Sequence, residues 1–167
     1  FSTGLRVSEL VNVKKNQINM EKDEFSVRGK GDKLRIVFVS QQAKHWLKEY
    51  LSRRPDVTGY MFVSHDRAGE KRHTAADVVG ESEHLTARSV QRLVKKYAAL
   101  AGITKRITPH TLRHSFATDL LTNGADIRSV QTLLGHSSIT TTQVYTHIAD
   151  QHLKEVYQAF HSRKRKA

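Results

Sequence analysis

The chain has 167 residues, a length suited to one compact domain rather than two. Its 28 lysines and arginines against 16 aspartates and glutamates give a formal net charge of +12 and a pI near 10.1, which favours nucleic acid as a partner over an acidic membrane surface. The absence of cysteine excludes disulfides, thiolate metal sites and a cysteine nucleophile, and no apolar run approaches the roughly 20 residues of a bilayer span. We expect a cytoplasmic protein, associated with the nucleoid if it is prokaryotic, with no membrane partner.

The opening segment FSTGLRVSEL lacks an initiator methionine and has the pattern of the middle of a helical segment. We therefore expect the chain to be a fragment of a longer protein. Apolar spacing over residues 5–13 predicts a short helix, with Ser2 or Thr3 available as its cap and Arg6 in its first turn.

The next segments predict a hairpin and a helix. The stretch FSVRGKGDKLRIVFVS has an apolar-rich arm on either side of GKGD, which predicts a β-hairpin with Lys30 at its tip. Residues 41–54 have helical periodicity and end before a proline, and YMFVS predicts a short strand. Residues 64–85 are polar and aperiodic, which indicates a surface loop or insertion rather than a domain boundary.

Residues 86–101 predict an amphipathic helix with apolar residues on one side. Its other side is basic and is equally consistent with a solvated face or with phosphate contact. The candidate DNA-binding residues on this basic side are Arg88, Arg92, Lys95 and Lys96.

Two helices are predicted over residues 110–122 and 126–134, the second with Asp126 as N-cap and Gly135 as its stop. A polar connector over residues 137–145 leads to a last helix over residues 150–160, and residues 161–167 form a basic tail. We expect residues 1–160 to form one mostly helical α+β domain with a small antiparallel sheet.

Several polar residues on this framework are not explained by packing. Arg6 and Arg113 both lie in helical segments, and two guanidinium forks suit the non-bridging oxygens of a phosphate. His110 precedes Arg113 by three residues, His136 follows a glycine, and Tyr145 comes late in the chain. Each residue alone has an ordinary structural explanation, so the combination carries the functional hypothesis.

The segments TGLRVSEL, GKGDKLRIV, PHTLRHSFATDLL and LLGHSSITTTQVYTH resemble, in this order, the catalytic domain of the tyrosine recombinases, the phage-integrase and Xer type of site-specific DNA recombinase. The resemblance covers the chain from Arg6 to about Phe160. It implies six catalytic residues: Arg6, Lys30, His110, Arg113, His136 and Tyr145.

The chemistry of these residue types agrees with those roles. Breaking a phosphodiester without water or metal needs an oxygen nucleophile, positive charge at phosphorus and a proton for the leaving oxygen. Tyr145 would attack the phosphate to give a 3′-phosphotyrosyl bond, which a second 5′-hydroxyl can reverse without ATP. Lys30 would protonate the leaving 5′-oxygen, His110 would deprotonate the tyrosine or orient the phosphate, and His136 would donate a hydrogen bond.

Two further residues are assigned supporting roles. Glu9 lies three residues after Arg6 and is expected to pair with it. His114 lies four residues after His110 and is expected to help position its neighbours. The histidines could imitate a zinc site, but no H-E-x-x-H pattern accompanies them, so we expect no metal and no other cofactor.

Two other functions remain as alternatives. Residues 126–145 also suit a non-catalytic helix-turn-helix regulator, and type IB topoisomerases and telomere resolvases resemble this family in their active-site residues.

The family resemblance implies a further N-terminal core-binding domain, double-stranded DNA rather than a small molecule as substrate, and a homo-tetramer on two DNA sites. The last helix would dock either on a neighbouring protomer or on its own core.

Overall fold

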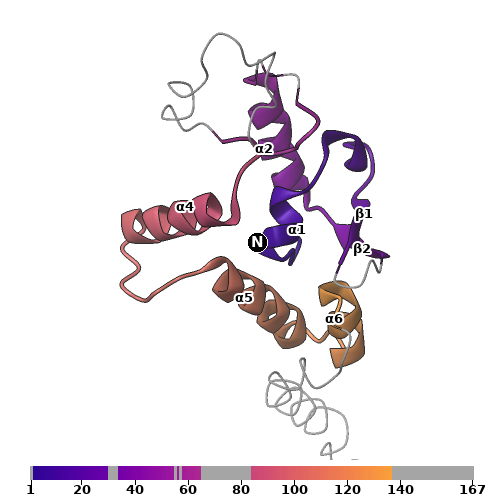
Figure 1. Cartoon of the computed structure of the whole chain (residues 1–167). Coiled ribbons are helices and arrows are strands. Elements are labelled where there is room, and N and C mark those ends of the chain that lie inside the picture. Colours follow the sequence, from indigo (N-terminus) through magenta and orange to yellow (C-terminus); the bar gives the residue numbers. More distant parts are fainter. Residues whose placement is uncertain (1, 30–33, 55, 57, 65–83, 137–167) are drawn as a thin grey trace, which may run out of the picture.

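The computed structural model describes residues 2–29, 34–54, 56, 58–64 and 84–136 (Figure 1). This part of the chain is mostly helical and contains a two-stranded antiparallel sheet, which confirms the predicted fold class. The elements are α1 (Val7–Val11), a 3-10 turn η1 (Lys15–Gln17), β1 (Glu24–Arg28), β2 (Leu34–Phe38), α2 (Gln41–Ser52), α4 (Ala87–Leu100), α5 (Pro109–Thr122) and α6 (Ile127–Leu134).

Several predicted features lie outside the described residues. These are the hairpin tip with Lys30, most of the polar segment 64–85, the connector with Tyr145, the last helix and the basic tail.

The predicted hairpin is present, with β1 and β2 paired from Glu24 opposite Phe38 to Arg28 opposite Leu34. Side chains alternate strictly between a buried and an exposed face along both strands. The buried face contributes to a first hydrophobic core: Val13, Phe25, Val27, Val37, Val39 and Met61. The same alternation places Arg35 on the buried face, among these apolar residues.

Helix α2 closes this core from one side, and its start is fixed by polar contacts. The Ser40 hydroxyl caps the helix by accepting a hydrogen bond from the backbone N–H of Ala43. Lys44 is buried in the second turn, and its Nζ lies 2.5 Å from Oδ1 of Asp23, just before β1. This ion pair joins the helix to the hairpin.

A second core lies between α5 and α6 and is built from Ala117, Leu121, Val130 and Leu134. Helix α5 begins with Pro109 in its first turn, and Thr108 caps it. Helix α6 begins at the predicted cap, Asp126, and ends at Gly135, whose φ of 64° is left-handed. Figure 1 shows α6 beside the hairpin, which brings the end of this helix close to β2.

Two local predictions were wrong. The YMFVS segment is not a strand, because it makes only the isolated bridges Lys14–Tyr60 and Val63–His84. Neither Ser2 nor Thr3 caps α1; Arg6 is the N-cap residue, and the Glu9 side chain returns to accept from the Arg6 backbone N–H. The left-handed φ of 58° at Gly4 breaks any helix before that point.

Helix α4 is present as predicted, but its apolar side is only partly buried. Val90 is buried, whereas Leu93, Tyr97 and Leu100 are 42%, 61% and 71% exposed. The helix contacts α1 and α5 and extends away from the sheet in Figure 1. Among the described helices, none is long and apolar enough to cross a membrane.

Gly4 permits a test of how tightly α1 is held against α5. A Cβ at this position would lie 2.5 Å from Cδ1 of Phe116, and the backbone is left-handed, so Gly4→Ala combines a clash with backbone strain. We expect a loss of unfolding free energy of about 2–4 kcal/mol in denaturant titration.

Substitutions at two other glycines separate the effect of the clash from the effect of the backbone strain. Gly102 has a φ of 71° with open space around it, so Gly102→Ala should cost only the strain, about 1–2 kcal/mol. Gly59 has neither feature, so Gly59→Ala should stay within about 0.5 kcal/mol of the original protein. Equal losses for Gly4→Ala and Gly102→Ala would contradict the close contact.

Candidate active site

Three arginines converge on the C-terminal end of α6. They come from three elements, and each donates to one of three consecutive backbone carbonyls: Arg35 Nε to Leu133 at 3.1 Å, Arg113 Nη2 to Leu134 at 2.5 Å and Arg6 Nη2 to Gly135 at 2.9 Å. The last carbonyls of a helix have no partner within it and carry the negative end of its dipole. The helix end therefore gathers the guanidiniums at one point.

Arg113 acts as a brace inside this cluster. The residue is 7% exposed, and besides Leu134 it donates through Nη1 to the backbone carbonyl of Gly4. One side chain thus joins α5 to the segment before α1 and to the end of α6.

Arg6 is the most exposed of the three arginines. Its side chain is 31% exposed, against 7% for the side chain of Arg35. The predicted pairing with Glu9 is confirmed: Nη1 lies 2.9 Å from Oε1 of Glu9, and the Arg6 backbone N–H donates to Oε2 at 2.7 Å. Arg6 therefore offers its charge at the surface while its backbone N–H and two of its guanidinium nitrogens are held by the protein.

Arg35 was missed in the sequence analysis, although a signal was present. It lies two residues before Val37, so it has the parity of the buried face of β2, and an arginine at such a position needs partners. The structure supplies a bidentate contact with Glu9 in which both N–O distances are 2.7 Å.

The pKa of Glu9 reflects this surrounding charge. Burial alone would raise the pKa of Glu9, but the hydrogen bond from Arg35, the backbone hydrogen bond from Arg6 and the charge of Arg35 together hold it below its ordinary value. Glu9 is therefore an anion shared by two arginines. Three guanidiniums and one carboxylate leave this cluster with an excess of positive charge.

His136 follows directly on the arginine-bound carbonyls. Burial first, and then the positive charges of Arg113, Arg6 and Arg35, lower the pKa of His136 to about 4. The ring is therefore neutral at physiological pH, with one N–H donor and one acceptor nitrogen. It can donate a hydrogen bond without adding charge.

His110 and His114 both lie on α5, one turn apart, and both are exposed. His110 is close enough to His136 to influence its pKa through charge. In the described part of the chain, no group of three histidines, aspartates or glutamates is arranged to hold a metal. The positioning role of His114 remains a prediction.

Four of the six sequence-predicted catalytic residues are thus placed, and the structure brings Arg6, His110, Arg113 and His136 together. Lys30 and Tyr145 lie outside the described residues.

The basic side of α4 borders an open groove of about 760 Å³. Arg88, Arg92 and Lys95 line it, and Lys105 and Arg106 from the segment between α4 and α5 add two cations that sequence reasoning did not single out. Lys96 instead lines a neighbouring hollow beside Leu93. Side chains on two segments make this a broad basic surface rather than one helix face.

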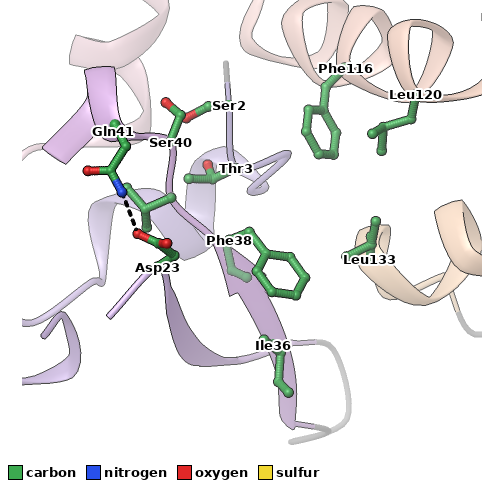
Figure 2. Close-up of a pocket in the computed structure, with 12 residues that line it drawn as sticks. Ser2, Thr3, Asp23, Ile36, Phe38, Ser40, Gln41, Phe116, Leu120 and Leu133 are labelled. Atoms are coloured by element: carbon green, nitrogen blue, oxygen red, sulfur yellow. Dashed lines mark hydrogen bonds between the residues drawn. The ribbon is translucent and has the colours of Figure 1, made fainter. Parts of the chain in front are cut away.

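A hollow of a different character lies beside the arginine cluster (Figure 2). Its wall is apolar, with Ile36 and Phe38 of β2 facing Phe116 and Leu120 of α5 and Leu133 of α6. The Gln41 amide donates to Asp23 at its far edge, at 2.9 Å. Among the described residues that line this hollow, none is a cation that could hold a phosphate.

The hairpin, the helices around it and the arginine-rich cluster define a catalytic domain of the tyrosine-recombinase class. The chain belongs to the phage integrase family, whose model matches residues 1–152.

Among relatives, the chain is 46% identical over 164 residues to the tyrosine recombinase XerD of Lacticaseibacillus casei, covering 98% of this chain and 53% of that protein. It is 46% identical over 156 residues to XerA of Pyrococcus furiosus, covering 93% of this chain and 50% of that one. The chain therefore spans about half the length of the curated relatives it matches.

Two solved structures share the fold. A crystal structure of XerA recombinase matches with a TM-score of 0.74 and 37% identity, covering 98% of this chain and 55% of that one. XerH bound to its palindromic difH substrate, in a post-cleavage complex, matches with a TM-score of 0.71 and 29% identity, covering 94% and 42%.

The charge around His136 gives a pH-dependent prediction. A lowered pKa means that between pH 6.5 and about 4 the unfolded chain binds a proton at this residue that the folded chain does not, so stability falls as the pH drops through this window. Above pH 6.5 the effect is absent. NMR titration of the His136 ring should give a pKa of about 4, and His136→Gln should lose less stability between pH 6.5 and 4 than the original protein. A His136 pKa at or above 6.5 would contradict the arrangement.

Proposed function

We propose that the chain is the catalytic part of a site-specific DNA recombinase that breaks and rejoins double-stranded DNA through a 3′-phosphotyrosyl intermediate. The observation that carries the proposal is the convergence of Arg6, Arg113 and neutral His136 at the end of α6. The site-bound XerH structure and the relatives named as tyrosine recombinases support the substrate class.

The phosphate would lie against the exposed edge of Arg6. Arg6 and Arg113 carry permanent positive charge, which stabilises the negative charge that grows on the non-bridging oxygens as phosphorus becomes five-coordinate. His136 donates a hydrogen bond to the same phosphate from a neutral ring. The protein positions these groups before substrate binds, so little reorganisation accompanies the reaction.

The bond changes assign the remaining roles. The Tyr145 oxygen forms a bond to phosphorus while the bond from phosphorus to the 5′-oxygen breaks, and the phosphate stays linked to the 3′ end. The phenolic proton passes to His110 or to solvent, and Lys30 supplies a proton to the 5′-oxygen. Attack by another 5′-hydroxyl reverses these changes and joins a new pair of strands. Exchange between two DNA sites would be carried out by four protomers.

The central test of this function is tyrosine-dependent covalent capture. The chain is incubated with nicked genomic DNA fragments, denatured, and the DNA that stays attached is sequenced. We expect adducts concentrated at one sequence, absent from Tyr145→Phe and retained in Tyr157→Phe, a matched change further along the chain. Capture that persists in Tyr145→Phe would exclude this nucleophile, and reversible binding without any adduct would favour the non-catalytic DNA-binding function.

The role of Lys30 has its own test, which uses the leaving group. Lys30→Ala should slow cleavage of ordinary DNA by about 10²-fold or more, yet cleave a substrate with sulfur in the 5′-bridging position at nearly the original rate, because a thiolate leaves without a proton. Lys33→Ala, which removes a lysine three residues further along the sequence, serves as the control and should lose little on either substrate. Equal losses on both substrates for Lys30→Ala would remove it from the general-acid role.

A further inference from the structure

Arg35 makes three hydrogen bonds to protein beside the site, yet the proposed chemistry does not use it. All three of its guanidinium nitrogens are bonded to protein: Nη1 and Nη2 to the two carboxylate oxygens of Glu9, and Nε to the carbonyl of Leu133. Its side chain is 7% exposed. This geometry directs Arg35 toward the protein rather than toward a ligand.

Glu9 passes the effect of Arg35 on to Arg6. The same two oxygens that accept from Arg35 also accept from Arg6, through its backbone N–H at 2.7 Å and its Nη1 at 2.9 Å. If Arg35 were absent, Arg6 would be the remaining charged partner of Glu9 in this set, and the carboxylate would neutralise it. Arg35 therefore leaves part of the charge of Arg6 available for a phosphate.

The end of α6 is adapted to this arginine. A Cβ on Gly135 would lie 2.8 Å from Cδ of Arg35, and the φ of 64° is the left-handed value that favours glycine. The side chain of Arg35 thus passes directly beneath the turn that leads to His136. Its contact with Leu133 fixes the same turn from the hairpin side.

We propose that Arg35 is a positioning residue that, by occupying Glu9 and the Leu133 carbonyl, sets the orientation of Arg6 and of the turn before His136. This inference depends on the proposed function for its consequence in cleavage, but the orientation of Arg6 can be measured without DNA. Because β2 carries Arg35, the hairpin and the phosphate site are joined by one side chain.

The matched control is Arg54, which has nearly the same surroundings away from the site. It makes a bidentate contact with Asp56, with distances of 2.6 and 2.5 Å, donates to the backbone carbonyls of Tyr60 and Met61, and has a side chain that is 3% exposed. Replacing either arginine by lysine keeps the charge and removes the fork. A purely structural role would make the two variants alike.

The first measurement follows the Arg6 Nε–H signal by NMR in the chain without DNA. We expect Arg35→Lys to shift or broaden this signal, and Arg54→Lys to leave it unchanged even if both variants lose similar thermal stability. An unchanged Arg6 signal in Arg35→Lys would overturn the proposal. If Arg35→Lys does not fold, the milder Glu9→Gln, which keeps a hydrogen-bonding side chain between the two arginines, must disturb the Arg6 signal, and an unchanged signal there would overturn it equally.

The second measurement is single-turnover cleavage of the duplex recovered by tyrosine-dependent capture. Arg35→Lys should cleave ordinary DNA about 10²-fold more slowly, the scale expected when a catalytic group is misplaced. The loss of cleavage rate should be smaller on a substrate with a neutral methylphosphonate at the scissile position, where less charge must be stabilised. In a protein that already carries Arg6→Ala, adding Arg35→Lys should reduce the cleavage rate little further. Losses equal on both substrates and fully additive with Arg6→Ala would show a general structural role and overturn the proposal.

The two measurements separate the possible failures. If no DNA is cleaved by the original protein, the proposed function fails while the Arg6 signal still decides the positioning role. If cleavage is normal and the Arg6 signal does not respond to Arg35→Lys, the positioning role fails while the proposed function stands.

Discussion

The end of α6 is the constraint on which the rest of the site depends. Three carbonyls that the helix cannot satisfy accept from arginines on β2, α5 and the cap of α1. These arginines are separated by long stretches of chain, and the helix end is the common acceptor that brings them together. Both hydrophobic cores serve this arrangement, because one packs the hairpin against the segments that flank α1 while the other packs α5 against α6.

Sequence patterns were sufficient for most of the fold because local signals decide it. The hairpin follows from alternating apolar residues around a glycine turn, and α6 follows from a cap at Asp126 and a stop at Gly135. The prediction of a strand at YMFVS was wrong because β-propensity does not supply a neighbouring strand. Met61 instead donates a single backbone hydrogen bond to the carbonyl of Val13. The prediction that Ser2 or Thr3 caps α1 was wrong because the left-handed Gly4 lies between these residues and the helix.

The site was predicted less completely, and the reason is geometric. Motif residues such as Arg6, Arg113 and His136 could be identified by type and order, but the sharing of Glu9 between Arg6 and Arg35 connects residues that no local pattern relates. Burial of Arg35 could have been inferred from strand parity, yet its partner could not. Long-range ion pairs are set by tertiary packing, which a one-dimensional pattern does not contain.

The charge balance of the cluster explains why an acidic residue belongs in a phosphate site. Three neighbouring guanidiniums without a counterion would repel one another and oppose folding, whereas a carboxylate held by each of them would cancel the charge that a phosphate needs. One buried Glu9 shared by two arginines satisfies both requirements, since it offsets part of the repulsion and leaves an excess. Burial, reinforced by that excess, keeps His136 neutral, so the site offers charge from arginine and a neutral hydrogen-bond donor from histidine at the same helix end.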